Sequence, residues 1–255
     1  MSNASPQIIE IPKCYEHPLH RFAAGASIVA VLGLSVAFLY RAVMLITSWQ
    51  AGLVFAASIV AGLIWADFMS GLVHWMADRY GTVEMPFLGN AFIKPFRIHH
   101  IAPEDITMHG FLDTNGNNSI VTLPVLLAAY IFINPAPGNL FGLFTIGSFV
   151  MMCIFVFLTN QTHKWAHMET PPPVLRFLGK FGLVLTPEHH EKHHTDPYDQ
   201  HYCITVGWLN PLLDSIKFFP FLERVVKAVT GIEAGEHGPY IPGFDENREF
   251  ELKHL

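Results

Sequence analysis

The sequence is poor in charge, cysteine and nucleotide-binding motifs, and each shortage excludes a class of protein. Lys, Arg, Asp and Glu make up 14% of the 255 residues, against roughly 25% in a typical soluble domain. The net charge of −6 argues against a nucleic-acid partner. The three cysteines form no CxxC pair, so neither a disulfide framework nor a cysteine zinc site is indicated. No GxGxxG fingerprint is present, so the chain shows no flavin or nucleotide domain of its own.

Apolar residues account for 51% of the chain and gather in four stretches. The first covers 22–46, and its first nineteen residues carry no formal charge, close to the roughly 20 that a helix needs to cross a bilayer. The others cover 51–77, 119–133 and 140–158. The third is short and contains Pro124, so it is either a marginal span or half of a re-entrant hairpin. We therefore expect an all-α, multi-pass membrane protein with about four transmembrane helices.

The basic residues predict how the chain is oriented. Of the 15 Lys and Arg, all but Arg41 lie before the first stretch, between the second and third, or after the fourth. Four spans place these three blocks on one side, which should be cytoplasmic by the positive-inside rule. We expect both termini there, in a bacterial inner membrane or the endoplasmic reticulum depending on the source. The predicted organisation is an N-terminal tail over 1–21, a membrane domain over 22–230 and a C-terminal tail over 231–255.

Histidine is the outlier of the composition, with 15 residues, as many as Lys and Arg together. None lies in the two turns, 47–50 and 134–139, that are expected on the opposite side. The pattern predicts a cytoplasmic, His-rich cap that binds metal.

One histidine lies at the end of the second apolar stretch, on a polar stripe. Asp67, Gly71, His74 and Asp78 are spaced four, three and four residues apart, which places them on one face of a helix. Ionisable groups in a membrane segment tend to face a functional interior. His74 is a candidate metal ligand. Asp78 and Asp67 are candidate ligands or acceptors for an imidazole N–H, and helix packing is the alternative.

Three further stretches carry candidate ligands. HxxxH after the fourth apolar stretch would place two imidazoles on one helix face. HHEKHH holds HxxHH, which can bind one metal or extend toward two, and its first histidine is a candidate for a further ligand or for a residue that supports a ligand. It also contains HExxH, a zinc-protease signature with Glu191 as general base. The candidate ligands of the three stretches are His99, His100, His109, His163, His167, His190, His193 and His194, with His189 as the further ligand or supporting residue.

Imidazole-rich sites suit zinc, copper, iron or nickel, and about nine histidines exceed the needs of one catalytic zinc. A redox metal beside an apolar chamber favours oxygen chemistry on a lipid. The stretches 174–185 and 204–229 are apolar or amphipathic; they lie either in the membrane interface or as a cap over the metal helices.

Several strings together resemble the Kua or CarF-like family of lipid desaturases, which includes plasmanylethanolamine desaturases. The resemblance covers roughly 65–230, and the strings occur in the family's order. They are DFMSGLVHW, AFIKPFRIHHIAPEDIT, HGFLDTNGNN, TNQTHKWAH, and HHEKHH followed by YCITVGWLN.

The resemblance implies a histidine-bound di-iron centre that uses O2 and electrons from cytochrome b5 or a ferredoxin-like donor. It implies formation of the vinyl-ether bond of plasmalogens in an ether phospholipid. The histidine boxes are His163 to His167 and His190 to His194, and His74, His99, His100 and His109 match additional family histidines. Desaturation of phospholipid acyl chains, an intramembrane zinc protease, and a metal transporter or sensor remain as alternatives.

Overall fold

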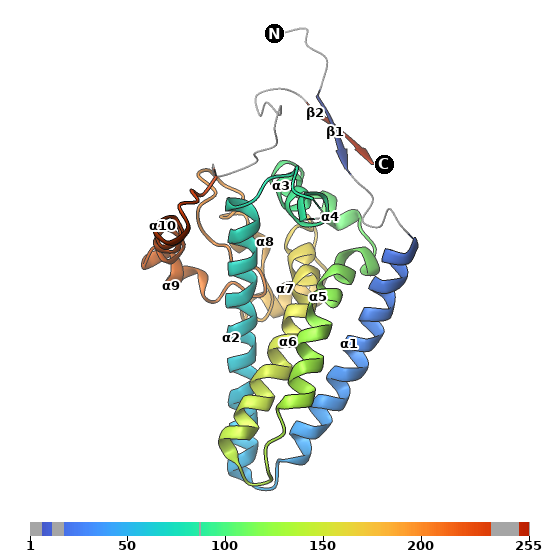
Figure 1. Ribbon diagram of the computed structural model, residues 1–255, viewed down its shortest axis with the longest axis vertical. Coiled ribbons are helices and arrows are strands. Elements are labelled where there is room, and N and C mark those ends of the chain that lie inside the picture. The colour runs from blue at the N-terminus through green and yellow to red at the C-terminus, as the bar shows by residue number, and fades with distance from the viewer. Residues whose placement is uncertain (1–6, 12–17, 87, 236–249, 255) are drawn as a thin grey trace.

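The computed structural model describes residues 7–11, 18–86, 88–235 and 250–254. Four long helices run side by side (Figure 1): α1 (Pro18–Met44), α2 (Trp49–Arg79), α5 (Phe111–Phe132) and α6 (Leu140–Ala166). α2 packs chiefly against α6, and α1 against α5. The approach of α2 to α6 is close because of glycine: a Cβ added to Gly62 would lie 2.6 Å from the Cβ of Met151.

Three of these helices, α1, α2 and α6, are long and apolar enough to cross a membrane. The fourth, α5, runs beside them but begins earlier than its apolar stretch, because its polar first turns bond to α6. The Asn118 amide donates to the carbonyl of Val156 at 3.2 Å, and the Asn160 amide donates to the carbonyl of Thr114 at 3.1 Å. The all-helical membrane architecture is confirmed, with α5 as a fourth helix of the bundle whose crossing is not established.

The two short connections, α1 to α2 and α5 to α6, lie at one end of the bundle (Figure 1). Arg41 is at this end, and its guanidinium donates to the carbonyls of Tyr130 (2.5 Å) and Ile133 (3.1 Å). It therefore satisfies carbonyls that the last turn of α5 leaves open. This role in capping α5 explains why Arg41 lies outside the three sequence blocks that hold the other basic residues.

The short elements gather at the other end (Figure 1). They are the π-helix η1 (Gly89–Ile93), α3 (Lys94–Ile101), α4 (Asp105–Met108), α7 (Pro173–Gly179), α8 (Pro187–His190), α9 (Asn210–Ser215) and α10 (Phe218–Thr230). Strands β1 (Gln7–Ile11) and β2 (Phe250–His254) pair in parallel, with Gln7 opposite Phe250. This pairing of the two tails was not expected from the sequence.

Candidate metal centre

The residues of the polar stripe on α2 have two different structural roles. The Asp67 carboxylate is fully buried and accepts the backbone N–H groups of Val206 (2.9 Å), Gly207 (2.8 Å) and Leu209 (3.0 Å). It therefore holds the loop 202–209 against α2. His74 and Asp78, farther along the stripe, are buried and face other histidines.

Of the three HH pairs, His99–His100 and His193–His194 each divide between two sets of candidate donors. Consecutive residues of a helix point about 100° apart, so His99 and His100 of α3 face different neighbours. The HHEKHH stretch is not one helix: α8 ends at His190 and a tight turn follows, in which the N–H of His193 bonds the carbonyl of His190 at 2.9 Å. This turn directs His193 away from His190 and His194. The HxxHH motif therefore extends toward two groups.

Two groups of donors result, and in each the donor atoms lie within 4.8 Å of one another; all the residues are buried except His167 and His194, which are half-buried. The five-histidine group comprises His99, His163, His167, His190 and His194; the Asp78 group comprises His74, Asp78, His100 and His193.

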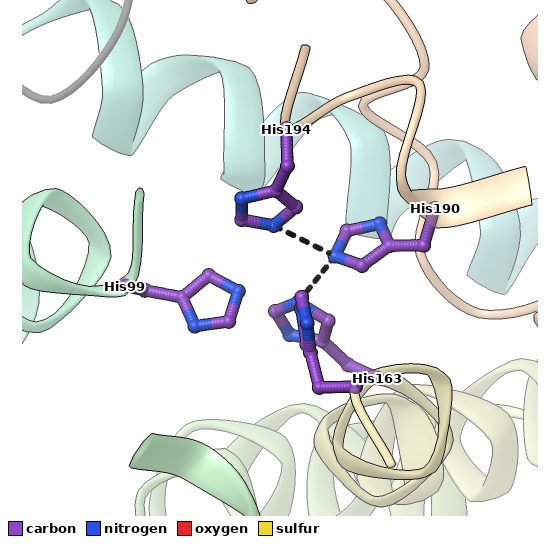
Figure 2. Close-up of side chains that lie close together, drawn as sticks. His99, His163, His190 and His194 are labelled. Atoms are coloured by element: carbon purple, nitrogen blue, oxygen red, sulfur yellow. Dashed lines mark hydrogen bonds between the residues drawn. The ribbon is translucent and has the colours of Figure 1, made fainter. Parts of the chain in front are cut away.

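Histidines of the five-histidine group point toward one another (Figure 2), and four of them approach through their Nε2 atoms. The Nε2 of His190 lies 2.8 Å from that of His163 and 3.1 Å from that of His194. The Nε2 of His167 lies 3.1 Å from that of His163. α6, α3 and the α8 turn all contribute, so the group forms only when these segments pack together.

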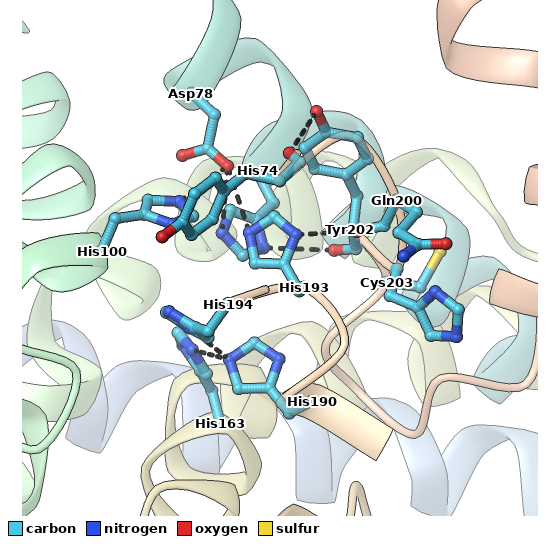
Figure 3. Close-up of polar contacts among 12 residues, drawn as sticks. His74, Asp78, His100, His163, His190, His193, His194, Gln200, Tyr202 and Cys203 are labelled. Carbon is cyan, nitrogen blue, oxygen red and sulfur yellow. Dashed lines mark hydrogen bonds and ion pairs between the residues drawn. The ribbon is translucent and has the colours of Figure 1, made fainter. Parts of the chain in front are cut away.

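The Asp78 group is centred on a carboxylate oxygen. Asp78 Oδ2 lies 3.1 Å from the Nε2 of His100, 3.3 Å from that of His193 and 3.4 Å from that of His74. The two groups adjoin (Figure 3), and the rings of His100 and His194 are 5.0 Å apart.

Backbone carbonyls orient two of these imidazoles. His193 Nδ1 lies 2.8 Å from the carbonyl oxygen of Gln200, and His74 Nδ1 lies 3.2 Å from that of Tyr202. A proton on each Nδ1 satisfies the carbonyl and leaves the lone pair of Nε2 pointing toward Asp78. This arrangement is typical of metal-bound histidine.

Most imidazoles of the five-histidine group lie outside the long helices, and burial keeps them neutral. It holds the pKa of His99 and of His190 well below the ordinary value, because a buried site disfavours the charged form, and neighbouring imidazoles lower the pKa further. Burial likewise lowers the pKa of His167 to about 3. Neutral imidazoles present lone pairs at physiological pH, which is the form that binds metal.

The donor chemistry fits metal ions. Both oxygens of Asp78 and the Nε2 atoms of His74, His99, His100 and His193 are buried, and among the described residues they have no hydrogen-bond partner beyond the Asp78–imidazole contacts given above. Buried polar atoms normally have partners. A cation in each group would satisfy the lone pairs that converge there, and it would offset the buried carboxylate.

Three candidate residues lie outside both groups. His109 follows the short helix α4, and its Nε2 lies 3.2 Å from Asp105 Oδ2. His189 lies apart from both groups: its Nε2 is 3.0 Å from the Asn210 amide nitrogen, and its ring centroid is 5.0 Å from that of His201. Asp67 is the third, occupied by the loop described above.

Sequence reasoning missed the residues that fix the loop 202–209. Asn210 accepts from the N–H of Cys203 (2.8 Å) and donates to its carbonyl (2.9 Å), which positions the preceding Tyr202 carbonyl against His74. The string YCITVGWLN carried the signal, but its spacing alone assigns no role to any of its residues.

The zinc-protease interpretation does not suit this geometry. His190 and His194 belong to one group, as HExxH requires, but the Glu191 side chain between them is exposed to solvent. A general base must reach a water on the metal, and this carboxylate is on the outside of the turn.

Comparison with known proteins agrees with the motifs. The family described as the lipid desaturase domain matches residues 63–237. The chain belongs to the lipid desaturase family. The resemblance seen in the sequence is thus confirmed, and as a member of this family the chain is an oxidoreductase.

The relatives include ether-lipid and chloroplast enzymes. Plasmanylethanolamine desaturase of Myxococcus xanthus is 44% identical, over 84% of this chain and 75% of its own length. Mouse plasmanylethanolamine desaturase 1 is 41% identical, over 84% and 80%. The chloroplastic fatty acid desaturase 4 of Arabidopsis thaliana is 33% identical, over 68% and 51%. No solved structure matches significantly.

Proposed function

We propose that this protein is an O2-dependent di-iron desaturase that converts plasmanylethanolamine into its 1-alkenyl form, plasmenylethanolamine. The observation that carries the proposal is the pair of adjoining donor groups, each with enough ligands for one metal. The substrate is taken from the names of the two relatives with the highest identity quoted above. The oxidoreductase family provides the reaction type.

In this proposal one iron is held by the five-histidine group and the other by the Asp78 group. When bound, the irons would supply the O2 activation that removes hydrogen from an unactivated CH2, which zinc lacks the redox chemistry to do. Asp78 places one negative charge in its group, whereas the five-histidine group is neutral. The two positions therefore differ in charge, and metal should bind more tightly where the carboxylate is.

The chain itself orients ligands and excludes water. The carbonyls of Gln200 and Tyr202 hold the rings of His193 and His74. Tyr202 and His193 are buried, with rings 5.1 Å apart, and close one side of the Asp78 group. A dry, preorganised ligand set would keep the reaction on the lipid instead of on solvent.

The reaction requires an external reductant. Removal of one hydrogen each from C1 and C2 of the alkyl chain, with O2, two electrons and two protons, yields the vinyl ether and two waters. Because the chain lacks a flavin or nucleotide fingerprint, we assign the electrons to a cytochrome b5-like or ferredoxin-like donor on the cytoplasmic side. The proposal places both termini on that side, with 22–230 as the catalytic domain and 1–21 and 231–255 as tails.

The depth of the site suits a bond next to the glycerol. The twenty residue steps from Trp49 to Met69 of α2 rise about 30 Å, roughly the thickness of the hydrocarbon core. Trp49 and Trp65 are exposed near the two limits of this stretch, as expected of interfacial aromatics. His74 lies about 7.5 Å beyond Met69. In a bilayer, C1 and C2 of the ether-linked chain lie close to the depth of His74. To reach the site, this lipid would therefore move out of the membrane less than a lipid that reacts in the middle of its acyl chain.

The test is expression in cells that lack plasmalogens, fed with alkylglycerol, with vinyl ethers measured by mass spectrometry. We expect plasmenylethanolamine from the wild type and none from His163→Ala, while His254→Ala, in β2, should match the wild type. Plasmanyl lipid that accumulates without vinyl ether, despite full iron loading and a competent donor, would reject this substrate.

Acyl-chain desaturation is the second candidate, favoured by the identity to the chloroplastic relative. The same lipid extracts decide between the two. A new double bond in phosphatidylglycerol acyl chains, without vinyl ether, would support the second candidate. Metal analysis is independent of both: two irons per chain are expected.

A further inference from the structure

Helix α10 has three distinct faces. Phe219, Leu222 and Val226 pack in the cluster that includes Trp75 of α2. The Glu223 carboxylate ties the helix to the end of α2, accepting from Arg79 Nε at 2.6 Å. This first face is the inner surface of a cap.

The second face is apolar and exposed. Phe221, Val225 and Val229 recur every four residues, which places them on one stripe. Their exposed fractions are 51%, 39% and 78%. The third face carries Arg224 and Lys227, both exposed. A helix packed on protein along one side, apolar on a second and charged on a third matches an element at a membrane–water boundary.

Two neighbouring elements share this character. α9 exposes Leu212 (57%), and Ile216 follows it at 58%. α7 exposes Val174 and Phe177, and Phe181 follows at 64%. The loops beside them are joined, because the Trp208 indole donates to the carbonyl of Gly182 at 2.6 Å.

The exposed charge on these elements is mainly basic. The ranges 173–183 and 210–230 contain only two acidic residues, and both bond inward: Asp214 lies 2.8 Å from His201, and Glu223 bonds Arg79. Lys227 pairs with Glu233 at the surface. The other exposed basic residues are Arg176, Lys180, Lys217 and Arg224.

α10 begins at the level of Phe68 and Met69 of α2, where a rise of about 30 Å from Trp49 would place the hydrocarbon boundary. The ring of Phe218, the first residue of α10, is 5.6 Å from that of Phe68, next to Met69. Figure 1 shows α9 and α10 beside the upper part of α2. Trp65, Met69 and Met76 keep the outer face of α2 apolar through this region. The exposed apolar faces thus continue the surface that α2 presents to lipid.

We propose that α7, α9 and α10 form an interfacial surface that rests in the headgroup layer of a leaflet containing anionic phospholipid. The apolar stripes enter the boundary of the acyl chains, and the basic residues meet the headgroups. This proposal rests on the membrane location of the helices and not on the reaction. For α10, it combines the two alternatives left open for 204–229: one face covers α2 and another contacts lipid.

The first experiment measures the depth of two adjacent residues. Val225→Cys and Arg224→Cys, each in a Cys14→Ser background, are labelled with an environment-sensitive fluorophore; Cys153 and Cys203 are buried. The full chain is placed in vesicles of phosphatidylcholine with phosphatidylglycerol. We expect the label at 225 to be quenched by doxyl groups near the lipid carbonyls and protected from iodide. The label at 224 should be more accessible to iodide.

Two results would overturn the proposal. Iodide access at 225 without lipid quenching would place the face in water. Protection at 225 from both quenchers would mean that protein covers it, from this chain or from a second copy. Neither result depends on activity, so failure here is distinguishable from failure of the proposed reaction.

The second experiment tests the charge. Spin-labelled phosphatidylglycerol and phosphatidylcholine are compared for the fraction immobilised by the protein in phosphatidylcholine vesicles. We expect the wild type to prefer phosphatidylglycerol severalfold, with the ratio falling toward one in Arg176→Gln/Lys180→Gln/Lys217→Gln/Arg224→Gln. Lys253→Gln, in β2, should keep the preference. Thermal unfolding and elution volume report whether the variant is folded, and an unchanged ratio in a folded variant would refute the role of these residues.

Discussion

The Asp78 carboxylate provides the sharpest test of the metal centre. Its Oδ2 atom lies 3.1–3.4 Å from three imidazole nitrogens, at the middle of its group. Asp78→Asn keeps the shape and removes the negative charge. The expected loss of metal affinity exceeds the roughly 10- to 100-fold that follows removal of a group that only supports a ligand, or about 1.4–2.8 kcal/mol. The five-histidine group is unchanged, so the variant should hold one metal where the wild type holds two.

The assay is titration of metal-depleted protein with Fe(II) under anaerobic conditions, with iron counted per chain. Asp105→Asn is the matched control, because Asp105 also pairs with a histidine four residues away, His109, but lies outside both groups. It should retain two metals. If Asp78→Asn binds two irons with wild-type affinity, Asp78 is not part of a metal site and the two-group assignment is wrong.

Three further predictions concern the site, its support and the topology. His109→Ala should keep both metals, and a loss of iron in that variant would place His109 among the ligands. Gly71→Ala should lower the thermal unfolding temperature, because its Cβ would lie 2.6 Å from the buried thiol of Cys203 and overpacking costs about 1–3 kcal/mol. The control Gly33→Ala, whose Cβ would have nothing within 4 Å, should change that temperature little. Equal shifts in the two variants would contradict the packing argument. Cysteines at Ser48 and Ala136 should react with impermeant reagent only from the side opposite the metal centre, and labelling of both from the cytoplasm would reverse the orientation.

The sequence by itself determined the class of protein and most of the residues that form the two donor groups. Runs of about twenty apolar residues predict membrane-spanning helices, because a helix satisfies all its backbone hydrogen bonds within the segment. The HxxxH and HHEKHH motifs identified residues by spacing alone, and eight of the nine candidate histidines lie in one of the two groups. Spacing also indicated that Asp78 lies on the same helix face as His74.

The tertiary structure alone decided how the candidate donors are divided between the two groups and which candidates lie outside both groups. A tight turn after His190, rather than a continued helix, separates His193 from His194, and no periodicity predicts where a turn tightens. His109 has a ligand-like residue type, but α4 directs it to Asp105. Asp67 has the spacing of a ligand, yet it holds a loop some 140 residues away in sequence. Each of these outcomes depends on contacts between segments that are distant in the chain, and local sequence pattern carries no information about those contacts.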